Sequence, residues 1–134
     1  MSDQKVRKAF EKRLATMTPA LDTAYENANY TPVTGTAYQS AFLLPAQPEN
    51  DTLGNGYYRE VGIFQIGIFY PLNTGPAAAE ARAELIRSHF RRGTSMTEDG
   101  QTVLVVRTPQ RTPGQSINDR YFIAVSIPYR SEVF

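Results

Sequence analysis

The sequence predicts an α+β fold, in which a mostly antiparallel or mixed sheet of about five strands carries two helices. Two segments, 3–17 and the one that follows Pro76, space their apolar residues as a helix does. Five other segments are rich in β-branched, aromatic and other apolar residues. The strands mostly follow one another instead of alternating with helices, which favours an antiparallel or mixed sheet. The expected order is α-β-β-β-α-β-β.

The first helix is expected over residues 3–17. Its apolar stripe consists of Val6, Ala9, Phe10, Leu14 and Met17, at spacings of three and four. Ser2 or Asp3 can cap its start. Thr18-Pro19 ends it, because the residue before a proline is disfavoured in the helical region.

Three strands are expected next, at 23–26, 37–44 and 57–70. The third has the strongest β signal, since one of its faces carries Phe64, Ile66, Ile68 and Tyr70 and the other carries Val61, Ile63 and Phe69. Because both faces are largely apolar, we expect this strand in the middle of the sheet.

A loop of about a dozen residues, Pro45 to Gly56, joins the second and third strands and is long for a hairpin. Together with the residues after it, the loop combines acids, an aliphatic residue, tyrosines and an arginine, a mixture that interface centres favour. We therefore predict that it contacts a neighbouring subunit or another protein. The candidate contact residues are Glu49, Asp51, Leu53, Tyr57, Tyr58 and Arg59. A plain surface loop is the alternative.

The second helix is expected to open at Thr74-Gly75-Pro76, with the proline at the first helical position and Gly93 just past the end. Its buried line is Ala79, Ala83, Ile86 and Phe90. A turn at Glu98-Asp99-Gly100 precedes a fourth strand at 102–108. A loop at 109–119 leads to a last strand at 120–128, in which Tyr121, Ile123, Val125 and Ile127 alternate inward.

The composition fits one domain, residues 1–134, with 41% hydrophobic and 20% charged residues. The chain contains no cysteine, which excludes disulfides, thiolate metal sites and cysteine nucleophiles. We expect no secretory signal and no membrane span, and therefore synthesis in a cytoplasm. Eight tyrosines suit protein contacts, although a tyrosine-rich core rim would give the same composition.

No group of residues in the sequence predicts catalysis, a cofactor or a metal. His89 is the only histidine, so a two-histidine metal site is impossible, and a helix-terminus role is the simpler interpretation. Glu80 and Glu84 lie one helical turn apart, but with Arg87 they are typical of a salt-bridged solvent face. Gly62 and Gly67 have the spacing of a phosphate loop but lie within a strand and lack the following lysine. We expect no enzyme.

The net charge of +1 conceals a segregation along the chain. No basic residue lies between Arg13 and Arg59, and the acids of that span are Asp22, Glu26, Glu49 and Asp51. Both helices are rich in basic residues. Complementary patches on one small domain favour head-to-tail contact between copies, whereas two solvated helices would show the same pattern.

The chain resembles the tail terminator (tail-completion) proteins of long-tailed bacteriophages. The resemblance spans nearly the whole chain and is clearest over residues 2–93; beyond them it rests on the strand pattern and on Ile127-Pro128-Tyr129. The matching runs are SDQKVRKA (2–9), MTPAL (17–21), LLPAQPEN (43–50), GYYRE (56–60), GIFQI (62–66), YPL (70–72), GP (75–76) and ARAELIR (81–87).

This resemblance implies a structural virion protein of the tail or neck. Tail terminators form a ring, usually of six copies, that caps the head-proximal end of the tail tube, stops its polymerisation and joins the tail to the head connector. The implied partners are further copies of the chain, the tail tube protein and the head–tail connector. Genome DNA would pass through the lumen without sequence-specific binding, and acids of the span 14–58 are candidates to line it. A neighbouring neck, head-closure or tube protein, or a small phage regulatory binding module, are the alternatives.

Overall fold

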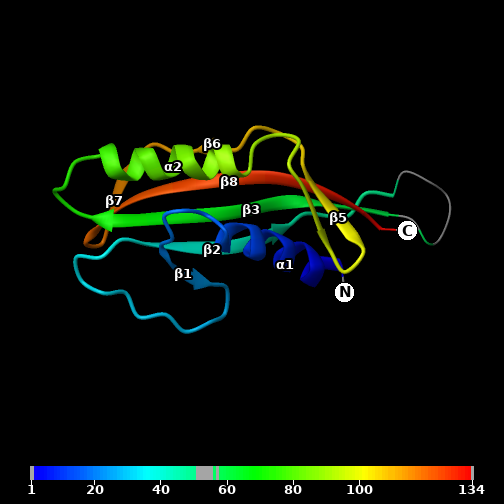
Figure 1. Cartoon of the computed structure of the whole chain (residues 1–134), viewed down its shortest axis with the longest axis horizontal. Coiled ribbons are helices and arrows are strands. Elements are labelled where there is room, and N and C mark those ends of the chain that lie inside the picture. The colour runs from blue at the N-terminus through cyan, green and yellow to red at the C-terminus, as the bar shows by residue number, and fades with distance from the viewer. Residues whose placement is uncertain (1, 51–55, 57, 134) are drawn as a thin grey trace.

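A computed structural model describes residues 2–50, 56 and 58–133 of the chain. One curved sheet runs the length of the molecule, and two helices lie on it (Figure 1). The two longest strands, β3 and β8, have 14 residues each, which corresponds to a length of about 45 Å. They pair with each other over that whole length and form the central strand pair of the domain.

The α+β class and the two helices are confirmed, but the number and order of the strands were wrong, because the sheet has eight strands within the described residues. The elements are α1 (Ser2–Ala15), β1 (Asp22–Tyr25), β2 (Tyr38–Pro45), β3 (Tyr58–Pro71), α2 (Ala77–His89), β4 (Ser95–Glu98), β5 (Gln101–Val105), β6 (Gln110–Arg111), β7 (Gln115–Ile117) and β8 (Arg120–Val133). The strands that were not predicted, β4, β6 and β7, have two to four residues and little apolar alternation. Their pairing with β5 and β8 defines them, which a local sequence pattern does not reveal.

The sheet is mixed, with the order β1-β2-β3-β8-β5-β4 and with β6 and β7 both paired to β8. The β1–β2 pair is parallel and every other pair is antiparallel. β3 lies between β2 and β8, so its predicted central position is confirmed. β8 runs to Val133, five residues beyond the predicted end, because it pairs with β3 as far as Tyr58.

The helix ends differ from the expected ones in detail. α1 begins at Ser2 and ends at Ala15, so Ser2 and Asp3 lie within the helix and the chain turns before Thr18-Pro19. Pro76 stands at the N-cap of α2, one position before its expected place. Phe90 is the C-cap, and Gly93, with φ of +91°, serves the turn that leads into β4.

Both helices cover the same face of the sheet. Phe10 of α1 stacks on Phe64 of β3 with ring centroids 4.5 Å apart, and it lies 5.8 Å from the ring of Phe90, just after α2. The ends of the helices are also tied together, since Arg13 Nε donates a hydrogen bond to the His89 carbonyl at 2.9 Å. The core is therefore one layer between the helices and a single sheet face.

The core also contains an arginine that the sequence did not indicate. Arg82 of α2 is 3% exposed; its guanidinium donates hydrogen bonds to the carbonyl of Pro19 and to Gln39 Oε1. Burial lowers the pKa of this guanidinium. The contacts join α2 to β2 and to the segment after α1.

Candidate functional site: the open face of the sheet

The sheet face opposite the helices, called here the open face, is apolar and partly exposed. Side chains alternate along a strand, so Ile63 points away from the helices while its neighbour Phe64 points toward them. In the register of the sheet, Leu44 pairs with Ile63 and Ile63 pairs with Pro128. Phe42, on β2, projects from this same face, two residues from Leu44.

These side chains are unusually exposed for their size. Phe42 is 43%, Leu44 48% and Ile63 37% exposed. Among the described residues, only Val33 and Leu85 are further large apolar side chains exposed to this degree. Three adjacent apolar side chains that remain in water make this surface a candidate for contact with a partner. We call Phe42, Leu44 and Ile63 the apolar patch.

A polar region adjoins the apolar patch along the strands. The next row of the register brings Val61 beside Arg130, and Arg130 beside Leu104 of β5. A shallow hollow of about 300 Å³ lies there, lined by Gly100, Thr102, Leu104, Arg130 and Glu132. The open face therefore combines an apolar centre with a charged border, as interfaces do.

The other end of this sheet face is covered by the chain itself. Arg120, 6% exposed, donates hydrogen bonds from its guanidinium to the carbonyls of Val33 and Thr36, which fixes the segment between β1 and β2 over the sheet. Beneath this segment, Tyr38 stacks on Phe69 with centroids 4.6 Å apart. This segment does not reach the apolar patch. The patch therefore remains exposed, although the other end of the same sheet face is covered.

The strand edge beside the apolar patch is closed to further strand pairing. β1 pairs with β2 only as far as Ala41. Beyond it, the Leu43 backbone N–H donates to Glu26 Oε1 at 3.0 Å, and Pro45 has no N–H to offer. Arg7 forms an ion pair with Glu26, with Arg7 Nη2 3.4 Å from Glu26 Oε2, and so keeps this carboxylate in place. A partner is thus expected to meet the face of this sheet and not its edge.

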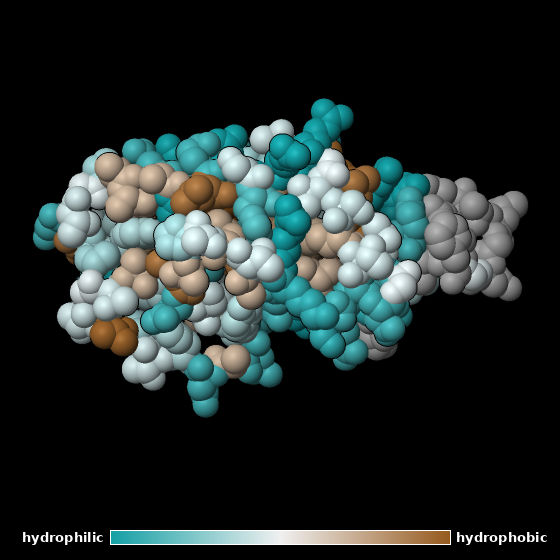
Figure 2. Space-filling view, viewed as in Figure 1, coloured by the Kyte–Doolittle hydropathy of each residue, from teal (hydrophilic) through white to brown (hydrophobic). Residues whose placement is uncertain are grey.

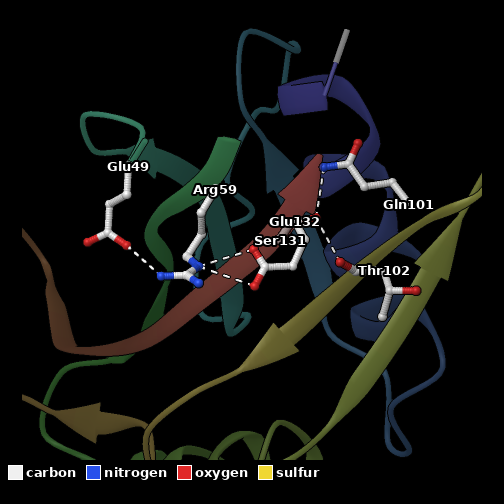
Figure 3. Close-up of polar contacts among 6 residues, drawn as sticks. All are labelled: Glu49, Arg59, Gln101, Thr102, Ser131 and Glu132. Carbon is white, nitrogen blue, oxygen red and sulfur yellow. Dashed lines mark hydrogen bonds and ion pairs between the residues drawn. The ribbon is translucent and has the colours of Figure 1, made fainter. Parts of the chain in front are cut away.

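At the far end of the open face, where β3 begins and β8 ends, three charged side chains form a cluster that we call the tip (Figure 3). Arg59 lies between Glu132, with Nε–Oε2 of 3.1 Å, and Glu49, with Nη1–Oε1 of 3.2 Å. Glu49 and Arg59 also exchange two backbone hydrogen bonds of 2.8 Å. The start of the predicted loop is therefore fastened to β3.

On the other side of β8, neutral hydrogen bonds hold the same strand end. Gln101 Nε2 donates to Ser131 Oγ at 2.8 Å, and Ser131 Oγ donates to the Thr102 carbonyl at 2.7 Å (Figure 3). Glu132 is therefore positioned from both sides, through β3 and through β5.

On the side of the molecule seen in Figure 2, hydrophilic residues gather from the middle toward this end, and most of the other half is paler.

The structure places three of the six predicted contact residues. Glu49 and Arg59 come together at the tip, and Tyr58 begins β3, where it pairs with Val133. Asp51, Leu53 and Tyr57 lie outside the described residues. The extent of the loop was wrong, because the Ala46 N–H bonds to the Val61 carbonyl at 2.9 Å and Glu49 pairs with Arg59.

Sequence reasoning missed the apolar patch, although the signal was present. The apolar second face of β3 was recognised but was taken as a sign of burial in the sheet. An additional signal lay in β2, where Phe42 and Leu44 share the face of Ile63. Two helices of ordinary length supply one covering layer, so one face of a long central strand had to remain open.

The segregated charges prove to be used largely within the domain. Lys12 Nζ lies 2.7 Å from Glu98 Oε1, and Lys8 lies 3.7 Å from the same carboxylate. Glu84 pairs with Arg87 at 2.8 Å, as expected for a solvent face. Arg91 and Arg92 are exposed, and no carboxylate of the described chain lies within 4 Å of either.

His89 has the helix-terminus position that was expected of it. Its Nε2 lies 2.7 Å from the Arg13 carbonyl and 3.1 Å from Thr16 Oγ1, both at the end of α1. Within the described residues, no three histidine, aspartate or glutamate side chains are placed to hold a metal ion. No described helix is long and apolar enough to cross a membrane.

The comparisons with known proteins agree with this arrangement. The family described as "Phage tail terminator protein" matches residues 5–129, nearly the whole chain. The chain belongs to the phage tail terminator family. Membership gives it a structural role in the bacteriophage tail. The match includes both helices nearly entire, the apolar patch and Glu49 and Arg59 of the tip, but stops short of Glu132.

A solved protein structure supports the same fold. It superposes with a TM-score of 0.77 at 28% sequence identity, covering 98% of this chain and 96% of the other. No curated protein sequence matches the chain significantly. The fold of this tail terminator family member is therefore also that of a second, separately determined chain of similar size.

Proposed function

We propose that this chain forms a closed ring, of six copies, that caps the head-proximal end of a phage tail tube. The ring stops tube polymerisation and provides the surface to which the head connector binds. The observation that carries the proposal is the family match over residues 5–129. The exposed apolar patch supports it, because an assembly protein needs such a surface and a lone domain does not.

The ring also provides the channel for the genome. DNA passes through the lumen without sequence-specific binding, so the lining repels phosphates instead of binding them. Asp22 is an exposed acid of the segment without basic residues and is a candidate for the lining. Glu26 of that segment is a weaker candidate, since Arg7 neutralises it.

Tail tubes grown in the presence of the protein test this function. Purified tube protein is polymerised with wild-type chain or with Ile63→Asp, and tube lengths and ends are measured by negative-stain electron microscopy. The wild type is expected to give capped tubes that stop growing, and Ile63→Asp is expected to give uncapped, overlong tubes. Val33→Asp is the matched control, because Val33 is 55% exposed and lies off the apolar patch.

Two results would contradict the capping role. The first is tubes of normal length when no wild-type chain is present, and the second is a ring located elsewhere in the neck. The second result would assign the chain to head closure. A single copy or a two-fold dimer at the tube end would contradict the ring.

We also propose that the segment from Glu49 to Arg59 contacts the tube or the neighbouring subunit. The tip holds Glu49 and Arg59, the two ends of this segment, together at the start of β3. Arg59→Ala removes the central cation and is expected to leave a folded domain with weaker capping. Circular dichroism checks the fold and tube length checks the capping. Unchanged tube lengths would remove the tip from the interface.

A further inference from the structure

We infer that the open face of one copy receives the outer surface of α2 from the next copy. This inference rests on the proposed ring and specifies the two surfaces that meet. The open face is the surface described above. Its occupant is a second copy of this chain, and four features of α2 and the sheet support that assignment.

The first feature is that α2 carries exposed apolar side chains on its outer side, beside the Glu84–Arg87 ion pair. Ala79, Ala83 and Ile86 are buried on the sheet. Ala78 and Ala81 point outward, and Leu85 is 43% exposed. Exposed apolar side chains next to charged ones are the composition that interfaces between proteins have.

The second feature is a complementary shape. Leu85 borders a shallow groove of about 280 Å³ between α2 and the end of α1, which Met17 and Thr18 also line. The apolar patch offers projecting side chains, whereas the outer surface of α2 offers alanines and a groove. Large side chains on one surface facing small ones on the other allow close packing.

The third feature is the placement of the two surfaces. The open face looks away from the helix layer, and the outer surface of α2 looks away from the sheet, so they lie on opposite sides of one domain. Two different surfaces that bind each other make a heterologous contact, which repeats from copy to copy and closes into a ring when the rotation allows.

The fourth feature is the order of the charges. From the apolar patch toward the tip, the open face carries first the cation Arg130 and then the acids Glu132 and Glu49 around Arg59. On the outer surface of α2, Glu84 lies next to Leu85 and is paired with Arg87, and the exposed cations Arg91 and Arg92 follow just beyond the end of the helix. The acids of the tip and the cations beyond α2 are opposite in sign, so they match when α2 lies with its end toward the tip.

The spacing is consistent with that pairing. Leu85 lies four residues before the last residue of α2, about 6 Å along the helix, and Arg91 and Arg92 follow in the turn beyond it. Ile63 and Arg59 are four residues apart, about 13 Å along a strand. The long arginine side chains bridge the difference. Arg91 and Arg92, which have no carboxylate partner in the described chain, thereby obtain one in the assembly.

Disulfide mapping tests this interface directly, since the chain contains no cysteine of its own. Two single-cysteine variants, Ile63→Cys and Leu85→Cys, are mixed, assembled on tail tubes and oxidised. The expected product is a covalent dimer of the two different variants, in at least tenfold excess over either self-linked dimer. Val33→Cys mixed with Leu85→Cys is the matched control and is expected to link only at background level.

A second measurement keeps the result independent of the tubes. Ile63→Asp retains the α2 surface and Leu85→Asp retains the open face, so each alone loses self-association. Their mixture is expected to form a one-to-one dimer and nothing larger in sedimentation velocity at high concentration. Self-linked dimers of Ile63→Cys would show that the open face pairs with itself and would overturn the inference.

These outcomes also separate the interface from the function. Capped tubes without the link between positions 63 and 85 would refute this interface and leave the proposed function intact. The link in a soluble oligomer that does not cap tubes would support the interface and refute the function.

Discussion

The two faces of the sheet are built from the same strands and yet have different roles. Phe64 points toward the helices and is fully buried, whereas its neighbour Ile63 points the other way and is 37% exposed. Both are large and apolar, so hydrophobicity alone does not determine which one enters the core. The helices and the segment between β1 and β2 determine it, because they cover one face completely and the other only in part.

This difference separates residues that stabilise the monomer from residues that we propose serve assembly. The covered face has a single continuous core, in which aromatic rings of three elements meet. The open face has an apolar centre and a charged border. The covered face should therefore respond to substitution in unfolding experiments, and the open face in assembly experiments.

The largest effect is expected for Phe64→Ala compared with Ile63→Ala. Removing the buried Phe64 ring leaves a cavity under Phe10 and should lower the free energy of unfolding by about 3 to 5 kcal/mol. Ile63→Ala should lower it by less than about 1 kcal/mol, because the side chain is partly in water already. Urea unfolding followed by circular dichroism measures both. Equal losses would show that the open face is a second core.

The next largest effect is expected for Arg82→Ala. It leaves the Pro19 carbonyl and the Gln39 amide oxygen without their charged donor, which should cost about 2 kcal/mol of unfolding free energy. Arg92→Ala, an exposed position just beyond α2, is the matched control and should change the stability by less than about 0.5 kcal/mol. Thermal unfolding of the two variants distinguishes a buried structural arginine from a surface one; similar melting temperatures would contradict this assignment.

A smaller, pH-dependent effect is expected at Glu98. The hydrogen bond from Lys12 is the main cause that lowers the pKa of this carboxylate below its ordinary value of 4.5. The ionised form is therefore stabilised in the folded state, and its contribution is complete above pH 4.5 and lost as the pH falls through the lower folded pKa. Glu98→Gln should be less stable than the wild type at pH 7 and equally stable near the acid end of the titration.

Unfolding at pH 7 and pH 3 tests this expectation, with Lys12→Met as the companion variant. If the two side chains act as a pair, the double variant should lose less stability than the sum of the two single losses. If the difference in unfolding free energy between the wild type and Glu98→Gln were the same at pH 7 and pH 3, the expected role of the Glu98 carboxylate would be contradicted. Glu98→Gln and Lys12→Met both lie away from the apolar patch, so both variants should still assemble.

The sequence was sufficient for the class, for both helices and for the central place of β3, because each depends on a long and strongly periodic apolar pattern. Short strands such as Gln110–Arg111 were not predicted, because only their pairing with β8 defines them. The exposure of the open face was not predicted, for a related reason. Alternation shows that Ile63 and Phe64 face opposite sides, but only the placement of the helices shows which side remains in water.

The candidate site was predicted in part. Glu49 and Arg59 were chosen because they flank a long loop, and they do meet at the tip. Glu132, which completes that cluster, lies 73 residues from Arg59 in the chain. Only the register of β3 and β8 brings them together, and local sequence patterns do not encode a register between distant strands.

The accessibility of position 63 in assembled tails tests the central claim that the open face is an assembly surface. Ile63→Cys and, as its control, Val33→Cys are labelled with a small maleimide, first as free protein and then within purified tails. Position 63 is expected to react in the free protein and at least tenfold more slowly in tails, while position 33 is expected to react at the same rate in both. Equal labelling of position 63 in free protein and in tails would contradict it.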